Sequence, residues 1–172
     1  ATGIQGDHEM MEVEFSEPIE ADELLEKLNH ESPSGLRFDS VELLDTGAKK
    51  LQPLAVEYRI GLPEDRRERV QAKIDELLAQ AHHKIHRPGR KQPIDLRADL
   101  IGLAIEQGEL RIEQRVTRQA NFQPRELLEV LGLADLESQG QHLTRSAIAW
   151  APPLESAAPQ SADPAHGKPQ ET

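Results

Sequence analysis

Cysteine is absent from the 172-residue chain, and aromatic residues are few: one Trp, one Tyr and three Phe. Without cysteine the chain forms no disulfide, thiolate zinc site, iron–sulfur cluster or cysteine nucleophile, and a cytoplasmic location is expected. No apolar run approaches the roughly 18 residues of a membrane span, so we expect no contact with a membrane. Because bulky aromatic residues are scarce, Leu, Ile, Val and Ala must supply most of the core.

Charge is unevenly distributed along the sequence. The net charge of −11 argues against nucleic-acid binding by bulk electrostatic attraction. Residues 7–31 hold ten acidic residues against one lysine, whereas residues 84–97 hold five basic residues against one aspartate. This asymmetry says more about partners than the total charge does.

One short unit occurs twice: an alternating strand-like run, a helix with the pattern Glu-Leu-Leu-Glu-x-Leu, and a second strand-like run. The first copy comprises residues 10–16, 21–28 and 36–44; the second comprises residues 110–116, 124–131 and 143–150. Such a unit cannot bury its apolar face alone, so the repeat predicts paired or stacked modules.

Only the second copy has a full set of elements before it. An alternating strand over 54–62 precedes a helix in which Val70, Ile74 and Leu77 recur at helical spacing. A short edge strand follows over 81–87, and then two strands, over 94–105 and 110–116, around the turn Gln107-Gly108. The order is close to βαββαβ, which predicts an α+β, ferredoxin-like domain: one antiparallel sheet with both helices on one face.

The pattern therefore predicts three parts of the chain. We expect a partial, half ferredoxin-like unit over residues 1–46 that lacks its opening elements, and a ferredoxin-like domain over 54–150. Residues 151–172 are dominated by Pro, Ala, Ser and Gln, which predicts a disordered tail.

Basic residues near the middle of the chain are the first candidates for a functional site. Arginine forks match phosphate oxygens, and a loop containing glycine can approach a nucleic-acid backbone closely. The alternative is a solvated loop, or one that pairs with the acidic first segment, because aromatic stacking partners are nearly absent. The candidates for RNA contact are Lys84, Arg87, Arg90, Lys91 and Arg97, extended by Arg111 and Arg115.

Three histidines, His82, His83 and His86, lie close together and are the only weak candidates for metal ligands. The competing interpretation is polar residues at a helix end. Asp95 and Arg97 are expected to share one face of a strand and to form ion pairs. The acidic residues of the first segment resemble the polar faces of amphipathic elements more than a catalytic pair.

Three stretches resemble a domain-of-unknown-function family that accompanies radical-SAM proteins. They are Ala1–Gly6 with Glu9–Glu14, Ile94–Arg97 with the basic residues before it, and the helix Pro124–Leu131. The resemblance covers residues 1–150. It implies a module that is free-standing or follows a cobalamin-binding radical-SAM module, often in RNA-processing contexts. In that family a basic and aromatic segment normally precedes the part that begins at Ala1, so the resemblance implies that the opening part of the module is missing here.

Three functions remain open from the sequence. The resemblance implies a non-catalytic accessory or substrate-recognition domain whose partners are a radical-SAM protein or module and RNA, with no cofactor in this chain. An unpaired strand edge would instead suit a protein-interaction adaptor that binds its radical-SAM partner without nucleic-acid contact. A hydrolase that uses the carboxylates or the three histidines is the third alternative.

Overall fold

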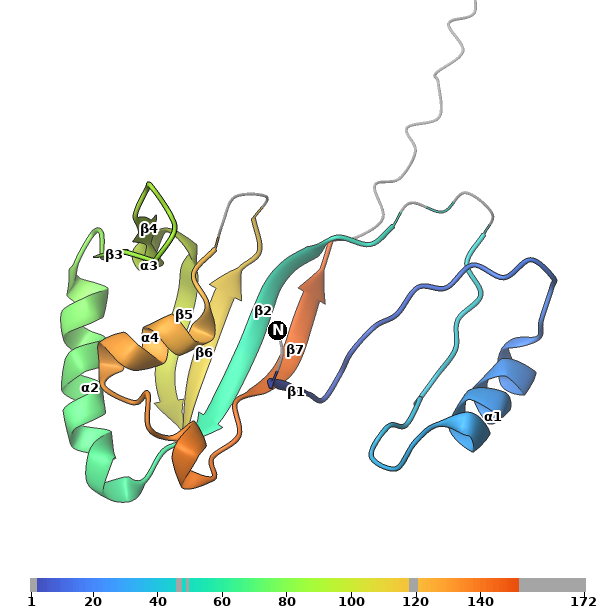
Figure 1. Ribbon diagram of the computed structural model, residues 1–172, viewed down its shortest axis with the longest axis horizontal. Helices are drawn as coiled ribbons and strands as arrows, with labels where there is room; N and C mark the ends of the chain where they lie inside the picture. Colours follow the sequence, from blue (N-terminus) through green and yellow to red (C-terminus); the bar gives the residue numbers. More distant parts are fainter. Residues whose placement is uncertain (1–2, 46–47, 49, 118–120, 152–172) are drawn as a thin grey trace, which may run out of the picture.

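The computed structural model describes residues 3–45, 48, 50–117 and 121–151, and it has mixed α+β architecture (Figure 1). The strands are β1 (Gln5–Gly6), β2 (Pro53–Gly61), β3 (Lys84–Ile85), β4 (Ile94–Asp95), β5 (Leu100–Glu106), β6 (Glu109–Arg115) and β7 (Thr144–Trp150). The helices are α1 (Ala21–Glu31), α2 (Glu64–Ala79), α3 (Leu96–Asp99), α4 (Pro124–Leu131) and the 3-10 helix η1 (Glu137–Gln139).

A five-stranded mixed sheet organises the structure, in the order β1-β7-β2-β6-β5. β2 pairs antiparallel with both β6 and β7, and β5 pairs antiparallel with β6. The short β1 is parallel to β7. β2 is therefore the central strand, and the two strands that flank α4 in the sequence lie on either side of it.

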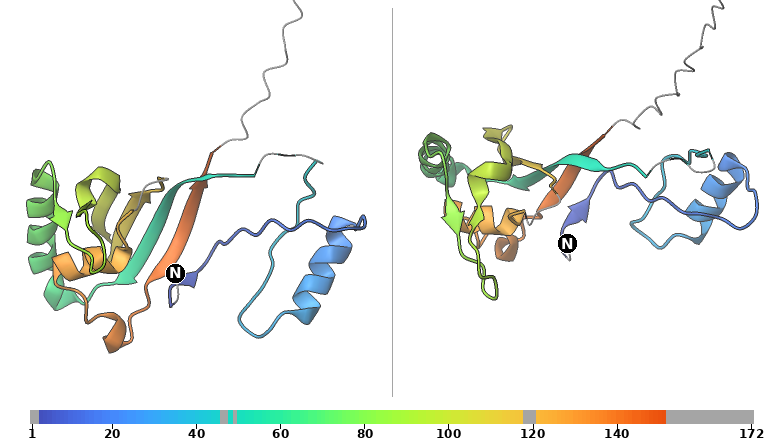
Figure 2. Two further views of the ribbon diagram at one scale, coloured as in Figure 1. Left: turned by 45° about the horizontal axis from the view of Figure 1, so that its top comes forward. Right: turned by 90° about the horizontal axis from the view of Figure 1, so that it is seen from above.

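Helices α2 and α4 cover one face of this sheet (Figure 2). The strands present Val56, Tyr58, Ile60, Leu110 and Ile112 to that face, because side chains alternate between faces along a strand. Both helices pack their apolar stripes on these side chains: Val70, Ile74 and Leu77 from α2, and Leu127, Leu128 and Leu131 from α4. Within the described residues, every buried apolar side chain lies between Ala55 and Leu143.

Local sequence explains the ends of these elements. Gln107 and Gly108 both have positive φ, 50° and 86°, which is the backbone of a tight two-residue hairpin turn between β5 and β6. Helix α4 begins with a capping box between Gln123 and Glu126, and it ends at Gly132 in the left-handed conformation.

Most predicted elements after residue 53 are confirmed: the strand at β2, the helices α2 and α4, the turn Gln107-Gly108, and the strands β6 and β7. The predicted strand over 94–105 is wrong in its first part, because α3 interrupts it. Asp95 caps α3 by accepting a hydrogen bond from the Arg97 amide at 3.1 Å, so the two residues do not share a strand face. Of the edge strand predicted over 81–87, only Lys84–Ile85 forms a strand, which is β3.

The first segment differs most from expectation. Helix α1 forms as predicted, but the strands predicted over 10–16 and 36–44 are wrong, because both stretches lack regular structure. An isolated strand is not stable without a neighbour to complete its hydrogen bonds. Residues 5–6 of the same segment pair with β7 as β1. The division of the chain between residues 46 and 54 stays a prediction, and the predicted disordered tail lies outside the described residues apart from Ala151.

Candidate functional site

The β3–β4 hairpin carries most of the basic residues that the sequence singles out. Its loop turns at Gly89, which has a φ of 81°, and the Arg90 amide donates to the Arg87 carbonyl at 3.0 Å. Lys84, Arg90 and Lys91 are exposed in this hairpin, and no hydrogen bond or ion pair from their side chains occurs within the part of the chain that the structure describes. They remain available to a ligand in solution.

Arg87 has a structural role in the same hairpin. Its guanidinium donates to both carboxylate oxygens of Glu126 at 2.7 Å and to the Asn121 carbonyl at 3.3 Å. These bonds lower the pKa of the Glu126 carboxyl, which also accepts from the Gln123 amide at the start of α4. Arg87 thus anchors the hairpin to α4 and is not free to contact phosphate.

The remaining predicted basic residues are divided between two places. Arg97 donates to the Gln80 carbonyl at 3.1 Å and so closes the end of α2. Arg111 and Arg115 lie on the open face of the sheet, as their spacing on one strand predicts. Arg115 is exposed, whereas Arg111 is held by Glu57 and Glu113. The structure therefore does not gather the seven predicted residues into one surface.

The open face of the sheet is a ladder of paired charges centred on Glu57. Its carboxylate accepts hydrogen bonds from Arg59 at 2.8 Å, from Arg111, and from Ser146 at 2.8 Å. Burial alone raises the pKa of Glu57, but these hydrogen bonds outweigh burial and lower the pKa to about 2. The alternation of charges at 57 and 59 and at 109, 111 and 113 was the sequence signal for this ladder.

The three histidines have different surroundings. His82 Nδ1 lies 2.6 Å from an Asp95 carboxylate oxygen, and His83 Nδ1 lies 2.9 Å from the Gln80 side-chain oxygen. His86 is exposed in the hairpin. Among the described residues, no group of three or more potential ligands is arranged to hold a metal ion.

A groove of about 570 Å³ lies between β2, the end of β6 and the start of α4, and sequence reasoning missed it. Its lining includes Ile4, Tyr58, Gln114, Phe122 and Arg125. Burial raises the pKa of the Tyr58 phenol in this groove. Arg125 donates to Glu137 and to the Gly3 carbonyl, so the polar rim is engaged in holding β1 against α4.

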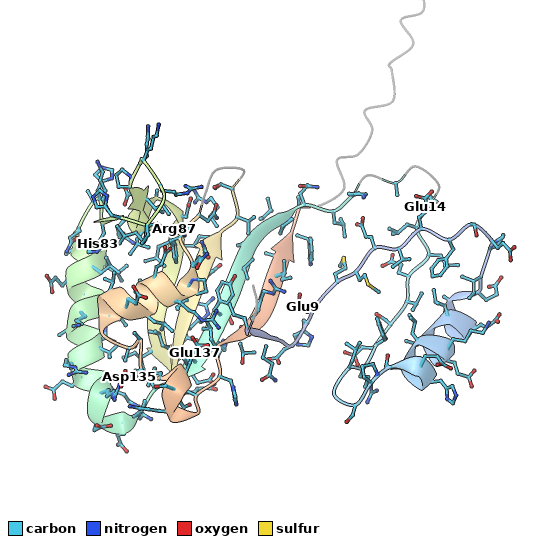
Figure 3. All side chains as sticks on the ribbon, in the orientation of Figure 1. Glu9, Glu14, His83, Arg87, Asp135 and Glu137 are labelled. Atoms are coloured by element: carbon cyan, nitrogen blue, oxygen red, sulfur yellow. The ribbon has the colours of Figure 1, made fainter. Side chains whose placement is uncertain are left out.

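The most unusual surface belongs to residues 7–45, which we call the acidic arm. The arm extends away from the sheet (Figures 1 and 2). The ion pair of Glu9 with Arg145 fixes its start beside β7 (Figure 3). Seven of the ten large apolar side chains that are exposed in the described residues belong to it: Met10, Met11, Val13, Phe15, Leu36, Leu43 and Leu44.

The two helices of the internal repeat have very different burial. In α4, Leu127, Leu128 and Leu131 are at most 1 % exposed. The matching residues of α1 are Leu24, Leu25 and Leu28, and none of them is buried. The same pattern of leucines is thus covered by a sheet in one copy and only partly covered in the other.

The sequence pattern of one protein family, described as "uncharacterized protein conserved in bacteria" (DUF2344), matches residues 1–124. The chain belongs to this family. No curated protein and no solved structure gives a significant match. The DUF2344 match includes the acidic arm, β2, α2 and the β3–β4 hairpin, and it ends at the first residue of α4.

Membership of DUF2344 supports the predicted domain of unknown function. Within the described part of this DUF2344 chain, no helix combines the length and the apolar character needed to cross a membrane. The arm is the candidate site that the geometry distinguishes most clearly. The internal repeat in the sequence pointed to this segment. The strands predicted there implied that its apolar residues would be buried, whereas the structure shows them exposed.

Proposed function

We propose that this chain is a non-catalytic protein-interaction module that binds a partner protein through its acidic arm. The difference between the two repeat helices carries this proposal. A solvent-exposed cluster of large apolar residues is costly for a protein in water and commonly marks an interaction surface. The arm combines these apolar residues with thirteen acidic residues, which favours a partner with a basic, apolar surface.

We further propose that residues 53–150 form a ferredoxin-like unit that presents the arm. The order β7-β2-β6-β5, with α2 between β2 and β5 and α4 between β6 and β7, supports this assignment. The ion pair of Glu9 with Arg145 and the pairing of β1 with β7 would hold the base of the arm on this unit.

We propose a radical-SAM protein or module as the partner, in the cytoplasm. The support is the resemblance of the arm, the hairpin and α4 to the family that accompanies such proteins. In this arrangement any radical chemistry belongs to the partner, and the chain positions the partner or its substrate.

RNA contact through the tip of the β3–β4 hairpin is the second candidate function. Arg90 and Lys91 favour it, because they are exposed and form no ion pair with the residues that the structure describes. The engagement of Arg87 with Glu126 and of Arg111 with Glu57 weakens it, because these guanidinium groups would have to leave charged partners to bind phosphate. The protein-binding proposal is therefore the stronger of the two.

The test is a titration of the purified chain with the purified radical-SAM protein of the same genome, after nuclease treatment, followed by calorimetry. The double variant Val13→Lys/Phe15→Lys should weaken binding by at least about thirtyfold, which corresponds to about 2 kcal/mol. The matched control Ile101→Lys changes an exposed apolar residue outside the arm and should leave affinity unchanged. Circular dichroism should show that all variants remain folded.

A second double variant, Arg90→Glu/Lys91→Glu, separates the two candidate functions. Under the protein-binding proposal it binds the partner as the wild-type chain does. Binding that needs RNA, falls with salt and disappears in this variant would support the hairpin instead. Equal affinity of the arm variant and the wild-type chain would reject the arm as the binding surface.

A further inference from the structure

The second copy of the repeat shows how this unit becomes part of a stable sheet. β6 and β7 flank α4 in the sequence but do not pair with each other. β2 lies between them and is antiparallel to both: Val56 is opposite Gln114 of β6 and opposite Ile148 of β7. The leucines of α4 are buried because this three-stranded surface lies beneath them.

The acidic arm has the same three parts without the central strand. Residues 10–16 and 36–44 flank α1. The first stretch alternates in polarity, so that an extended backbone would place Met11, Val13 and Phe15 on one side and Glu12 and Glu14 on the other, and the second alternates over residues 36–39. Neither stretch pairs with a strand within the described residues.

One edge of the second stretch is already occupied by α1. The Asn29 side chain donates to the Phe38 carbonyl at 2.9 Å and accepts from the Phe38 amide at 2.9 Å. In extended backbone, the amide and carbonyl of one residue point to the same side, and those of its neighbours point to the other. The groups of Arg37 and Asp39 therefore face away from Asn29, toward the side where another strand can pair.

We propose that the partner of the arm inserts a β-strand between residues 10–16 and 36–44, antiparallel to both, in the position that β2 occupies in the second copy. This inference rests on the proposed protein-binding function and specifies its chemistry. Alternate residues of the inserted strand are apolar and pack with Met11, Val13 and Phe15 against the leucines of α1. The residues between them are basic, because they lie beside Glu12 and Glu14 and in the field of the arm.

The source of this strand is a separate polypeptide, in the manner of β-strand addition. Main-chain hydrogen bonds to both stretches would provide much of the affinity. The alternation of apolar and basic residues would provide specificity. Binding would then convert two irregular segments into strands and bury Leu24, Leu25 and Leu28 as their counterparts in α4 are buried.

The test uses a designed peptide with the length of β2, 9 residues, in which lysine alternates with valine. Amide hydrogen exchange of the isotope-labelled chain is measured by NMR with about 1 mM peptide and without it. The amides of Arg37 and Asp39, and alternate amides of residues 10–16, should exchange about tenfold more slowly, equivalent to about 1.4 kcal/mol. A peptide with proline at its centre cannot complete the ladder and should give no protection.

The possible outcomes distinguish strand insertion from binding of a partner to the arm by other contacts. Protection confined to α1, or no protection by the alternating peptide, would overturn strand insertion. If strand insertion fails this test but the Val13→Lys/Phe15→Lys variant still binds the radical-SAM protein more weakly than the wild-type chain does, the protein-binding function stands without strand insertion. If the peptide protects both stretches but the radical-SAM protein does not bind, the surface is assigned correctly and the proposed partner is wrong.

Discussion

Replacement of Leu127 by alanine is expected to lower the free energy of unfolding by about 2–5 kcal/mol, the range found for buried Leu→Ala changes. Leu127 is fully buried between α4 and the sheet, so truncation leaves a cavity that the surrounding core cannot fill completely. Against a total stability of about 5–15 kcal/mol, such a loss shifts the urea unfolding midpoint strongly.

Leu24→Ala is the matched control, because Leu24 holds the same place in the first repeat helix. It is only partly buried, and no buried residue of the core lies in its helix. We expect a change below about 1 kcal/mol in the unfolding of the sheet. Similar losses for both variants in urea titrations would show that α1 belongs to the same cooperative core as α4.

Glu57→Gln is expected to cost about 1–3 kcal/mol of stability at pH 7. One pKa unit corresponds to about 1.4 kcal/mol, and solvent screening of this partly exposed carboxylate reduces the full value of the shift. The folded-state pKa of Glu57 is about 2, below its ordinary value of 4.5, because hydrogen bonds from Arg59, Ser146 and Arg111 favour the carboxylate. Because the folded-state value is the lower one, this stabilisation is complete above about pH 4.5 and is lost as the pH falls through about 2.

The measurement compares the unfolding free energies of the wild-type chain and the Glu57→Gln variant between pH 7 and pH 2. The difference should be largest at neutral pH and should shrink as the pH falls below 4.5. Other carboxylates titrate equally in both proteins and therefore cancel in the difference. A difference that does not change with pH would mean that the charge of Glu57 contributes little and that the ladder on the open face is held by other contacts.

Local signals in the sequence were sufficient to predict most helices and strands after residue 53. Val70, Ile74 and Leu77 mark α2 by their spacing, and Gln107-Gly108 marks the hairpin turn, because both signals act over a few residues. The interruption by α3 was not predictable from alternation alone. It depends on the Asp95 side chain, which accepts from the amides of His83 and Arg97, and one of these is distant in the sequence.

The candidate sites show the same limit. The basic residues look alike in the sequence, yet Arg87 is bound to Glu126 while Arg90 is exposed, and only the tertiary structure separates them. The strands expected at 10–16 and 36–44 failed for a related reason. Their polarity is that of strands, but strand formation needs hydrogen-bonding neighbours, and a strand pattern does not reveal whether such neighbours exist.

Native-state hydrogen exchange of the free chain measures whether the acidic arm lies outside the core formed by residues 53–150. The amides of Val13 and Phe15 should exchange at rates close to those of an unfolded chain, whereas those of Tyr58 and Ile112 in the sheet should exchange only through global unfolding. Protection of the arm amides equal to that of Tyr58 and Ile112 would show instead that the arm belongs to this core.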